Sequence, residues 1–111
     1  MTKQAYTAGK YTAETRTQEI MNIHAALVAA CALTKKGWKP IVPHVSGSHL
    51  RTWEEAMNDC RAIIQGMNPR TDCLVLIPGW EESVGAREEA VLARDMGLPI
   101  FLLEDIYEVG A

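Results

Sequence analysis

Residues 73–89 read CLVLIPGWEESVGAREE, and this stretch decides the fold. Its first five residues form a continuous apolar run, which is typical of a strand buried on both faces of a parallel sheet. Gly79 follows the run, and a helix is predicted from this segment to about Met96. A buried strand that leads directly into a helix is the repeating unit of an α/β fold.

The same alternation extends outward over the whole chain. Strands are predicted at Gln4–Thr7, Lys39–Pro43, Leu74–Ile77 and Pro99–Leu103. The order β-α-β-α-β-α-β with nearly all-apolar strands predicts a parallel sheet covered on both faces. We therefore expect an α/β fold, a three-layer α/β/α Rossmann-like (flavodoxin-like) domain with four to five parallel strands. At 111 residues the chain is expected to form a single domain, 1–111.

Each helix is predicted from its boundary signals and its apolar spacing. The first runs from Glu14 to Lys36 and stops at Gly37, and the second begins at a Thr52 N-cap with Glu55 completing a capping box. The inward face of the first is predicted to consist of Ile20, Ile23, Leu27, Ala30 and Cys31, and that of the second of Trp53, Met57, Cys60, Ile64 and Met67.

Composition excludes several classes of partner. The net charge of −3 offers no basic patch for nucleic acid. The longest apolar stretch, Ala25–Leu33, is too short to span a membrane, and no export signal follows Met1. The three cysteines lie in apolar patterns without a C-x-x-C pair, so we expect buried thiols in a reducing cytoplasm and no metal site: Cys31, Cys60 and Cys73.

Glu89 stands out within the third helix. At about 100° per residue it falls on the apolar stripe of that helix rather than on its polar side. A carboxylate is costly to bury without compensation. Glu89 is therefore a candidate catalytic group, with a structural carboxylate as the alternative. Its neighbours on the stripe are Gly85, Leu92, Ala93 and Met96, and the polar side carries Arg87, Glu88, Arg94 and Asp95.

Ligands of such sheets bind beyond the carboxyl ends of the strands. The segment after the first strand, Gly9-Lys10-Tyr11, lacks the further glycines of a dinucleotide fingerprint, and the chain contains no P-loop. We therefore expect neither NAD nor a nucleoside triphosphate, and no cofactor. A smaller ligand fits these loops better.

Residues Tyr6-Thr7-Ala8-Gly9-Lys10-Tyr11 resemble the Y-x-A-G-P-x opening of the nucleoside 2-deoxyribosyltransferase superfamily. The helix carrying Asp59, the strand at Asp72 and the segment Ser83-x-Gly85-x-x-x-Glu89 follow in that family's order. The chain most closely resembles small uncharacterised domains, often phage-encoded, with a G-W-E-x-S-x-G-A-x-x-E signature, which occupies residues 79–89. Lys10 replaces the proline that is usual in the superfamily.

The resemblance implies cleavage of the N-glycosidic bond of a 2'-deoxynucleoside or its 5'-monophosphate, by hydrolysis or deoxyribosyl transfer. Glu89 matches the glutamate that attacks the anomeric carbon, and Asp59 matches the family's acid. Ser83 stands where enzymes acting on free nucleosides usually carry an aspartate that binds the 5'-hydroxyl. The related deoxynucleoside 5'-monophosphate N-hydrolases carry a serine there that contacts the phosphate. The serine favours a monophosphate substrate, because a carboxylate would repel phosphate.

The remaining candidates are substrate-binding residues, each with a structural alternative. Ser83 is also a plausible N-cap, Trp80 either stacks on a base or covers the edge of the core, and Trp53 is expected in the core. The full set is Tyr6, Gly9, Lys10, His44, Trp80, Ser83 and Gly85.

Two functions from different classes stay open: a glycosidase or transferase that uses Glu89, and a non-catalytic nucleotide-binding or sensing module with the same pocket. By analogy with the superfamily we also expect a homo-oligomer with sites near the subunit contacts.

Overall fold

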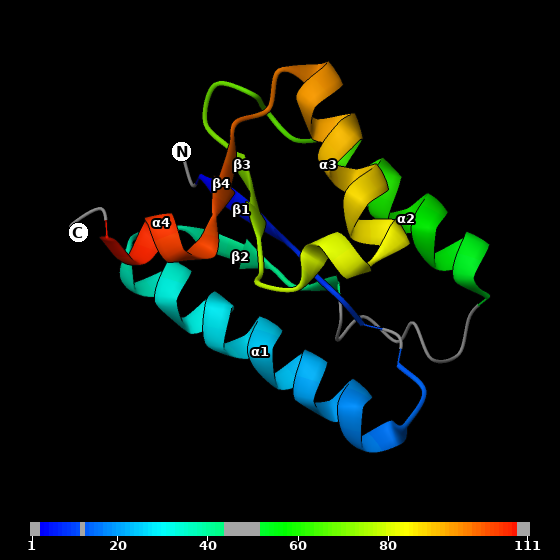
Figure 1. Ribbon diagram of the computed structural model, residues 1–111. Helices are drawn as coiled ribbons and strands as arrows, with labels where there is room; N and C mark the ends of the chain where they lie inside the picture. Colours follow the sequence, from blue (N-terminus) through cyan, green and yellow to red (C-terminus); the bar gives the residue numbers. More distant parts are fainter. Residues whose placement is uncertain (1–2, 12, 44–51, 109–111) are drawn as a thin grey trace.

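The computed structural model describes residues 3–11, 13–43 and 52–108, which form a four-stranded parallel sheet with helices on both faces (Figure 1). The strand order is β2-β1-β3-β4, with neighbouring strands parallel throughout. The elements in chain order are β1 (Gln4–Ala8), α1 (Arg16–Lys35), β2 (Lys39–Ile41), α2 (Trp53–Gln65), β3 (Cys73–Leu76), the 3-10 turn η3 (Trp80–Glu82), α3 (Val84–Met96), β4 (Ile100–Leu102) and α4 (Leu103–Glu108).

The expected three-layer α/β/α Rossmann-like fold is confirmed. Helices α1 and α4 cover one face of the sheet, and α2 and α3 cover the other (Figure 1). The chain moves from β1 outward to β2 and then crosses back to β3. The strand order therefore reverses between β1 and β3, and this is where ligands of open α/β sheets bind.

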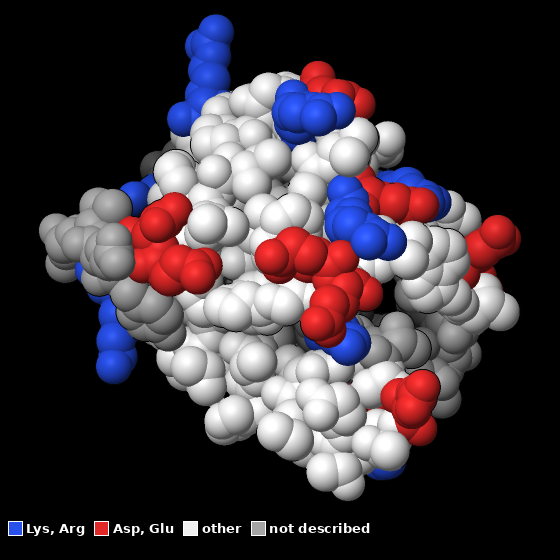
Figure 2. Space-filling model, in the orientation of Figure 1, with Lys and Arg blue, Asp and Glu red and all other residues white. Residues whose placement is uncertain are grey.

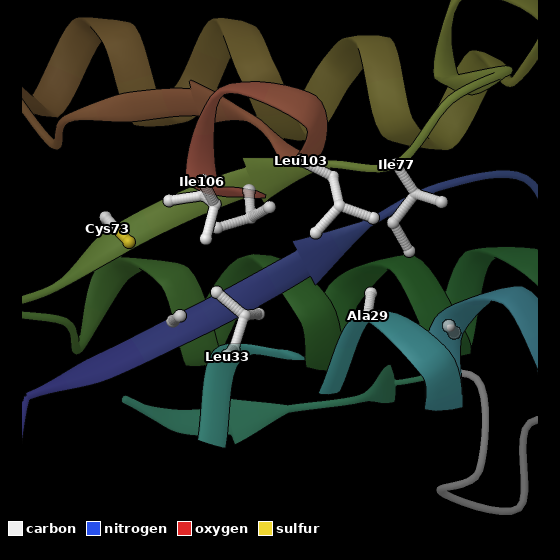
Figure 3. Close-up of a cluster of buried hydrophobic side chains, with 9 residues drawn as sticks. Ala29, Leu33, Cys73, Ile77, Leu103 and Ile106 are labelled. Carbon is white, nitrogen blue, oxygen red and sulfur yellow. The ribbon is translucent and has the colours of Figure 1, made fainter. Parts of the chain in front are cut away.

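The central strands β1 and β3 contribute to a hydrophobic core on each face of the sheet, because successive side chains of a strand point to opposite faces. From β3 and the residue after it, Cys73, Val75 and Ile77 face α1 and α4. Figure 3 shows Cys73 and Ile77 packed near Leu33, Leu103 and Ile106. The alternate residues, Leu74 and Leu76, face α2 and α3. This two-sided burial explains why the strand is apolar without alternation.

The predicted inward face of α1 is correct only in part, because Ile23 and Ala30 are half-buried but the other predicted residues are exposed. Its buried residues are Ala26, Ala29 and Leu33, whereas Ile20 and Leu27 are 54% and 44% exposed. The helix is apolar on all sides, so its periodicity does not select a face. Small alanines pack against the sheet because they allow the helix axis to approach closely.

The predicted helix boundaries hold at the second and third helices. Thr52 caps α2, and its side chain and that of Glu55 form the expected capping box. Ser83 caps α3 by accepting the Ala86 amide at 3.1 Å, and Gly97 ends the helix in the left-handed conformation. The short helix α4 was not expected from the sequence.

The buried carboxylate of Asp72 ties two strands together at their amino ends. It accepts the amides of Gln4 and Asn68, each at 2.8 Å, and the Thr71 hydroxyl at 3.2 Å. Asp72 thus joins the start of β1 to the turn that leads into β3. It lies at the amino ends of these strands, whereas ligands are expected at the carboxyl ends.

The cysteine prediction is correct in part. Cys73 is buried and Cys60 is half-buried, but Cys31 is exposed because α1 turns a different face to the sheet. All three are free thiols. None of the helices in residues 3–11, 13–43 and 52–108 combines the length and the apolar character that a membrane span requires.

Candidate active site

A cavity of about 100 Å³ opens at the carboxyl end of β1, between α2 and α3. It lies at the point where the strand order reverses. Strand β1 and the loop after it contribute Thr7, Gly9 and Tyr11; α2 contributes Trp53, Ala56, Met57 and Cys60; α3 and its cap contribute Ser83, Gly85, Ala86 and Glu89; Pro43 completes the wall.

Glu89 carries the carboxylate of this cavity. Glu89 lies on the stripe of α3 that was predicted from the sequence, together with the buried Gly85 and Ala93, and it is only 6% exposed. One carboxylate oxygen, Oε2, accepts a hydrogen bond from the hydroxyl of Tyr6. A buried acidic group is therefore held in a fixed orientation at the edge of an open cavity.

Tyr6 does not line the cavity but contacts Glu89 from the side of the hydrophobic core. It lies in the middle of β1, is fully buried, and packs in the core under α2 and α3. Burial raises the pKa of Tyr6 well above its usual value, and the nearby Glu89 carboxylate adds to the effect. Its hydroxyl therefore stays protonated and serves as a donor.

Burial also raises the pKa of Glu89, to about 7. The hydrogen bond from Tyr6, the Cys60 thiol and the positive charge of Arg61 act in the opposite direction but do not cancel the effect of burial. Near neutral pH the carboxyl group therefore exists in both protonation states. Such a shift in a concave site is characteristic of catalytic groups.

Cys60 is a residue that the sequence interpretation missed. It was assigned to the inward face of α2, but that face forms the cavity wall as well as the core. Cys60 is half-buried and interacts with both Tyr6 and Glu89. The signal available in the sequence was its position three residues after Met57, on the stripe of α2 that faces α3.

The glycines of the motif permit close packing around the cavity. A Cβ atom at Gly85 would lie 3.0 Å from the Met57 sulfur, so the missing side chain lets α3 approach α2. A Cβ atom at Gly9 would lie 3.0 Å from Cβ of the buried Ile77. Both glycines line the cavity, together with Ser83.

A second cavity, of about 310 Å³, adjoins the first and shares Trp53, Ser83 and Gly85 with it. Lys10 and Glu82 line this outer cavity and form an ion pair at 3.1 Å. Figure 2 shows acidic and basic side chains close together beside a hollow near the middle of this face. The pair joins the loop after β1 to the turn before α3.

Besides Tyr6, two further predicted site residues lie outside both cavities. Asp59 is exposed on α2 and lines neither cavity, because one residue along a helix is a rotation of about 100° and Cys60 takes the inward position. Trp80 is half-buried and packs against the core, as its structural alternative proposed. Trp53, expected in the core, is instead 48% exposed and lines both cavities.

His44 lies outside the described residues. Among the residues that the structure does describe, no group of three or more histidine, cysteine, aspartate or glutamate side chains is placed to hold a metal ion.

The comparison with protein families gives one match of note. The family described as a domain of unknown function (DUF4406) matches residues 3–102, a range that includes every element from β1 to β4. No curated protein matches the chain.

Proposed function

We propose a function for this chain, which belongs to the DUF4406 family of domains of unknown function. The chain cleaves the N-glycosidic bond of 2'-deoxynucleoside 5'-monophosphates, by hydrolysis or deoxyribosyl transfer, through a covalent intermediate on Glu89. The proposal joins the resemblance to nucleoside 2-deoxyribosyltransferases with the chemistry of the cavity.

One observation carries the proposal: a carboxylate that is 6% exposed lines an open cavity and is held by a neutral donor. A structural carboxylate of comparable burial would be expected to meet a cation or several backbone amides, as Asp72 meets two amides. Among the described residues, the hydrogen bond that Glu89 receives comes from a phenol, which fixes its direction but carries no opposite charge, and the positive charge of Arg61 offsets the effect of burial only in part. A nucleophile needs this combination of fixed geometry and weak solvation.

The reaction proceeds in two displacements at the anomeric carbon. The ionised Glu89 carboxylate attacks C1', the C1'–N bond breaks, and the base leaves with the bonding electron pair and takes up a proton. Water or a second base then attacks C1', the ester bond to Glu89 breaks, and the carboxylate is regenerated; the attacking group loses its proton to solvent. Both steps pass through an oxocarbenium-like state that the nearby carboxylate stabilises.

Water supplies the proton to the leaving base in this proposal. Asp59, which the resemblance identifies as the acid, lines neither of the two cavities. The cavity opens to the solvent between α2 and α3, so water reaches the leaving group.

Ser83 supports a 5'-monophosphate as the substrate. It caps α3 and lines both cavities, so a group bound beside it lies at the positive end of a helix of 13 residues. Lys10 lies on the wall of the outer cavity and is paired with Glu82. A bound phosphate would compete with Glu82 for this ammonium group.

The test is release of free base from a panel of deoxynucleosides and their 5'-monophosphates, followed by chromatography. We expect release from the monophosphates by the wild-type protein and none by Glu89→Gln. The matched control is Glu88→Gln, which removes an exposed carboxylate from the adjacent position of the same helix. Release by Glu89→Gln at the wild-type rate would contradict the proposal.

The rate of base release should depend on pH through the ionisation of Glu89. Because the carboxyl group has a pKa of about 7 and attacks only when ionised, the rate should rise with pH and level off above about pH 8. Below about pH 6 it should fall roughly tenfold for each pH unit. Initial rates between pH 5 and 9 test this, and a rate that is constant from pH 5 to 7 would contradict it.

A second candidate is a non-catalytic nucleotide-binding or sensing module. The exposed position of Asp59 favours it, because the cavity then lacks the acid that the superfamily uses. Nucleotide binding without base release in the panel would support this candidate.

We further propose that the protein works in a reducing, cytoplasmic compartment, because such a compartment keeps the exposed thiol of Cys31 reduced.

We also propose that the chain forms a homodimer through α1. Exposed apolar side chains on α1 form a stripe of Ile20, Met21, Leu27 and Val28. In an antiparallel pair of α1 helices centred on Leu27, the acidic first turn at Glu19 lies beside the basic last turn at Lys35. Light scattering should give twice the mass of one chain, and Leu27→Glu should reduce it to one. A wild-type monomer would contradict this proposal.

A further inference from the structure

We propose that Cys60 is a positioning residue for Glu89, with its thiol as the second hydrogen-bond donor to the carboxylate that Tyr6 already holds. The effect of this hydrogen bond on catalysis rests on the proposed function, but the hydrogen bond itself does not. Neither the resemblance nor the family description assigns a role to this position.

Geometry places the thiol at the carboxylate. Trp53, Ala56, Met57 and Cys60 are spaced along α2 so that one stripe of the helix forms a wall of the cavity. Trp53 is at the outer end of this wall, where the second cavity begins, and Cys60 lies two turns farther along. Cys60 and Glu89 line the same cavity from α2 and α3, and the thiol affects the pKa of both Glu89 and the Tyr6 hydroxyl, which donates to Glu89.

The protonation states make both neighbours of Glu89 donors. Burial raises the pKa of the Cys60 thiol; the hydrogen bond with Tyr6 opposes this rise, and the negative charge of Glu89 adds to it. The thiol therefore stays protonated at neutral pH and has a hydrogen to donate. Since Tyr6 donates to Oε2, the thiol is a second donor to the carboxylate. Two donors from different elements fix the carboxylate plane better than one does.

Other charged groups near Glu89 are farther toward the surface. Arg61 on α2 lowers the pKa of Glu89 and Glu88 on α3 raises it. These two residues form an ion pair with each other at 2.9 Å and are partly exposed, so they largely neutralise one another. Tyr6 and Cys60 are the two groups that most strongly oppose the effect of burial on the pKa of Glu89.

The test is a titration of the Glu89 carboxyl carbon by NMR in protein labelled with 13C at glutamate side chains, with Glu89→Gln to assign the signal. In Cys60→Ala we expect the midpoint to rise by about one pH unit, because the ionised form loses a donor. Cys60→Ser keeps a donor of similar size and should stay near the wild-type midpoint. Cys31→Ala, at an exposed thiol, should leave it unchanged.

The direction of the change separates positioning from packing. Removing the sulfur only as a packing element admits water, which lowers the midpoint instead of raising it. An unchanged or lowered midpoint in Cys60→Ala, or equal rises in Cys60→Ala and Cys60→Ser, would overturn the proposal. The titration needs no substrate, so its outcome is independent of whether base release is observed.

Discussion

Glu89→Gln is expected to be more stable than the wild-type protein above pH 7 while losing base release about a thousandfold or more. The amide keeps the size of the side chain and still accepts the Tyr6 hydrogen bond, but it has no charge to bury. Opposite changes in stability and activity are characteristic of a residue whose placement serves function at a cost to folding.

The sign and size of the stability change follow from the pKa of Glu89. It rises from 4.5 to about 7 on folding, so the folded protein holds this proton more tightly than the unfolded chain does. The wild-type free energy of unfolding therefore falls as pH increases from about 4.5 to about 7, by roughly 3 kcal/mol in total. Glu89→Gln lacks this loss, so the two proteins should be similar at pH 4 and differ by about that amount at pH 8.

Urea unfolding at pH 4 and pH 8 measures this difference. Glu88→Gln is the control: it changes an exposed carboxylate one position earlier and should alter stability by less than about 1 kcal/mol at either pH. A Glu89→Gln protein less stable than wild type at pH 8 would mean that the carboxylate is a structural anchor.

Asp72→Ala is expected to destabilise the fold by about 3–5 kcal/mol, a large part of the stability of a small domain. The substitution leaves the part-buried amides of Gln4 and Asn68 without their acceptor and detaches the start of β1 from the turn before β3. The effect concerns folding, because Asp72 lies at the sheet edge opposite the cavity.

Thermal and urea unfolding of Asp72→Ala measure the loss, with Asp95→Ala as the control at an exposed position of α3. The control should stay within about 0.5 kcal/mol of wild type. If Asp72→Ala also stays within 1 kcal/mol, the carboxylate does not hold the two strands together.

The sheet and its order of elements were predictable because the strands are apolar and their boundaries carry strong local signals. The capping box at Thr52 and Glu55 and the glycine that ends α3 act within one turn of helix, so the sequence alone defines them. The short helix α4 has no comparable boundary signal and was not predicted.

The orientation of α1 was not predictable from periodicity. When apolar residues surround a helix, the face that packs is decided by how closely it approaches the sheet. Ala26 and Ala29 pack inward, and larger residues such as Leu27 are left outside. The wrong prediction for Cys31 has the same cause.

The candidate residues predicted on α3 line the cavity, whereas Asp59, the one predicted on α2, does not. Glu89, Ser83 and Gly85 follow one another on a single helix whose buried stripe is clear, and the cavity contains all three. On α2 the resemblance selected Asp59, but a rotation of about 100° separates it from Cys60, which takes the position that faces the cavity. The exchanged roles of Trp53 and Trp80 depend on how α2 packs beside α3, which no local pattern specifies.

The central claim is that Glu89 forms a covalent bond to the sugar, and trapping that bond tests it most directly. A deoxynucleoside 5'-monophosphate carrying fluorine at C2' slows breakdown of the glycosyl-enzyme, and intact-protein mass spectrometry then detects the adduct. Tryptic cleavage yields the peptide 88–94, in which fragmentation distinguishes Glu89 from Glu88. We predict an adduct on Glu89 that is absent from Glu89→Gln and retained in Glu88→Gln. Base release by the wild-type protein with no adduct, or with an adduct at another residue, would contradict the account.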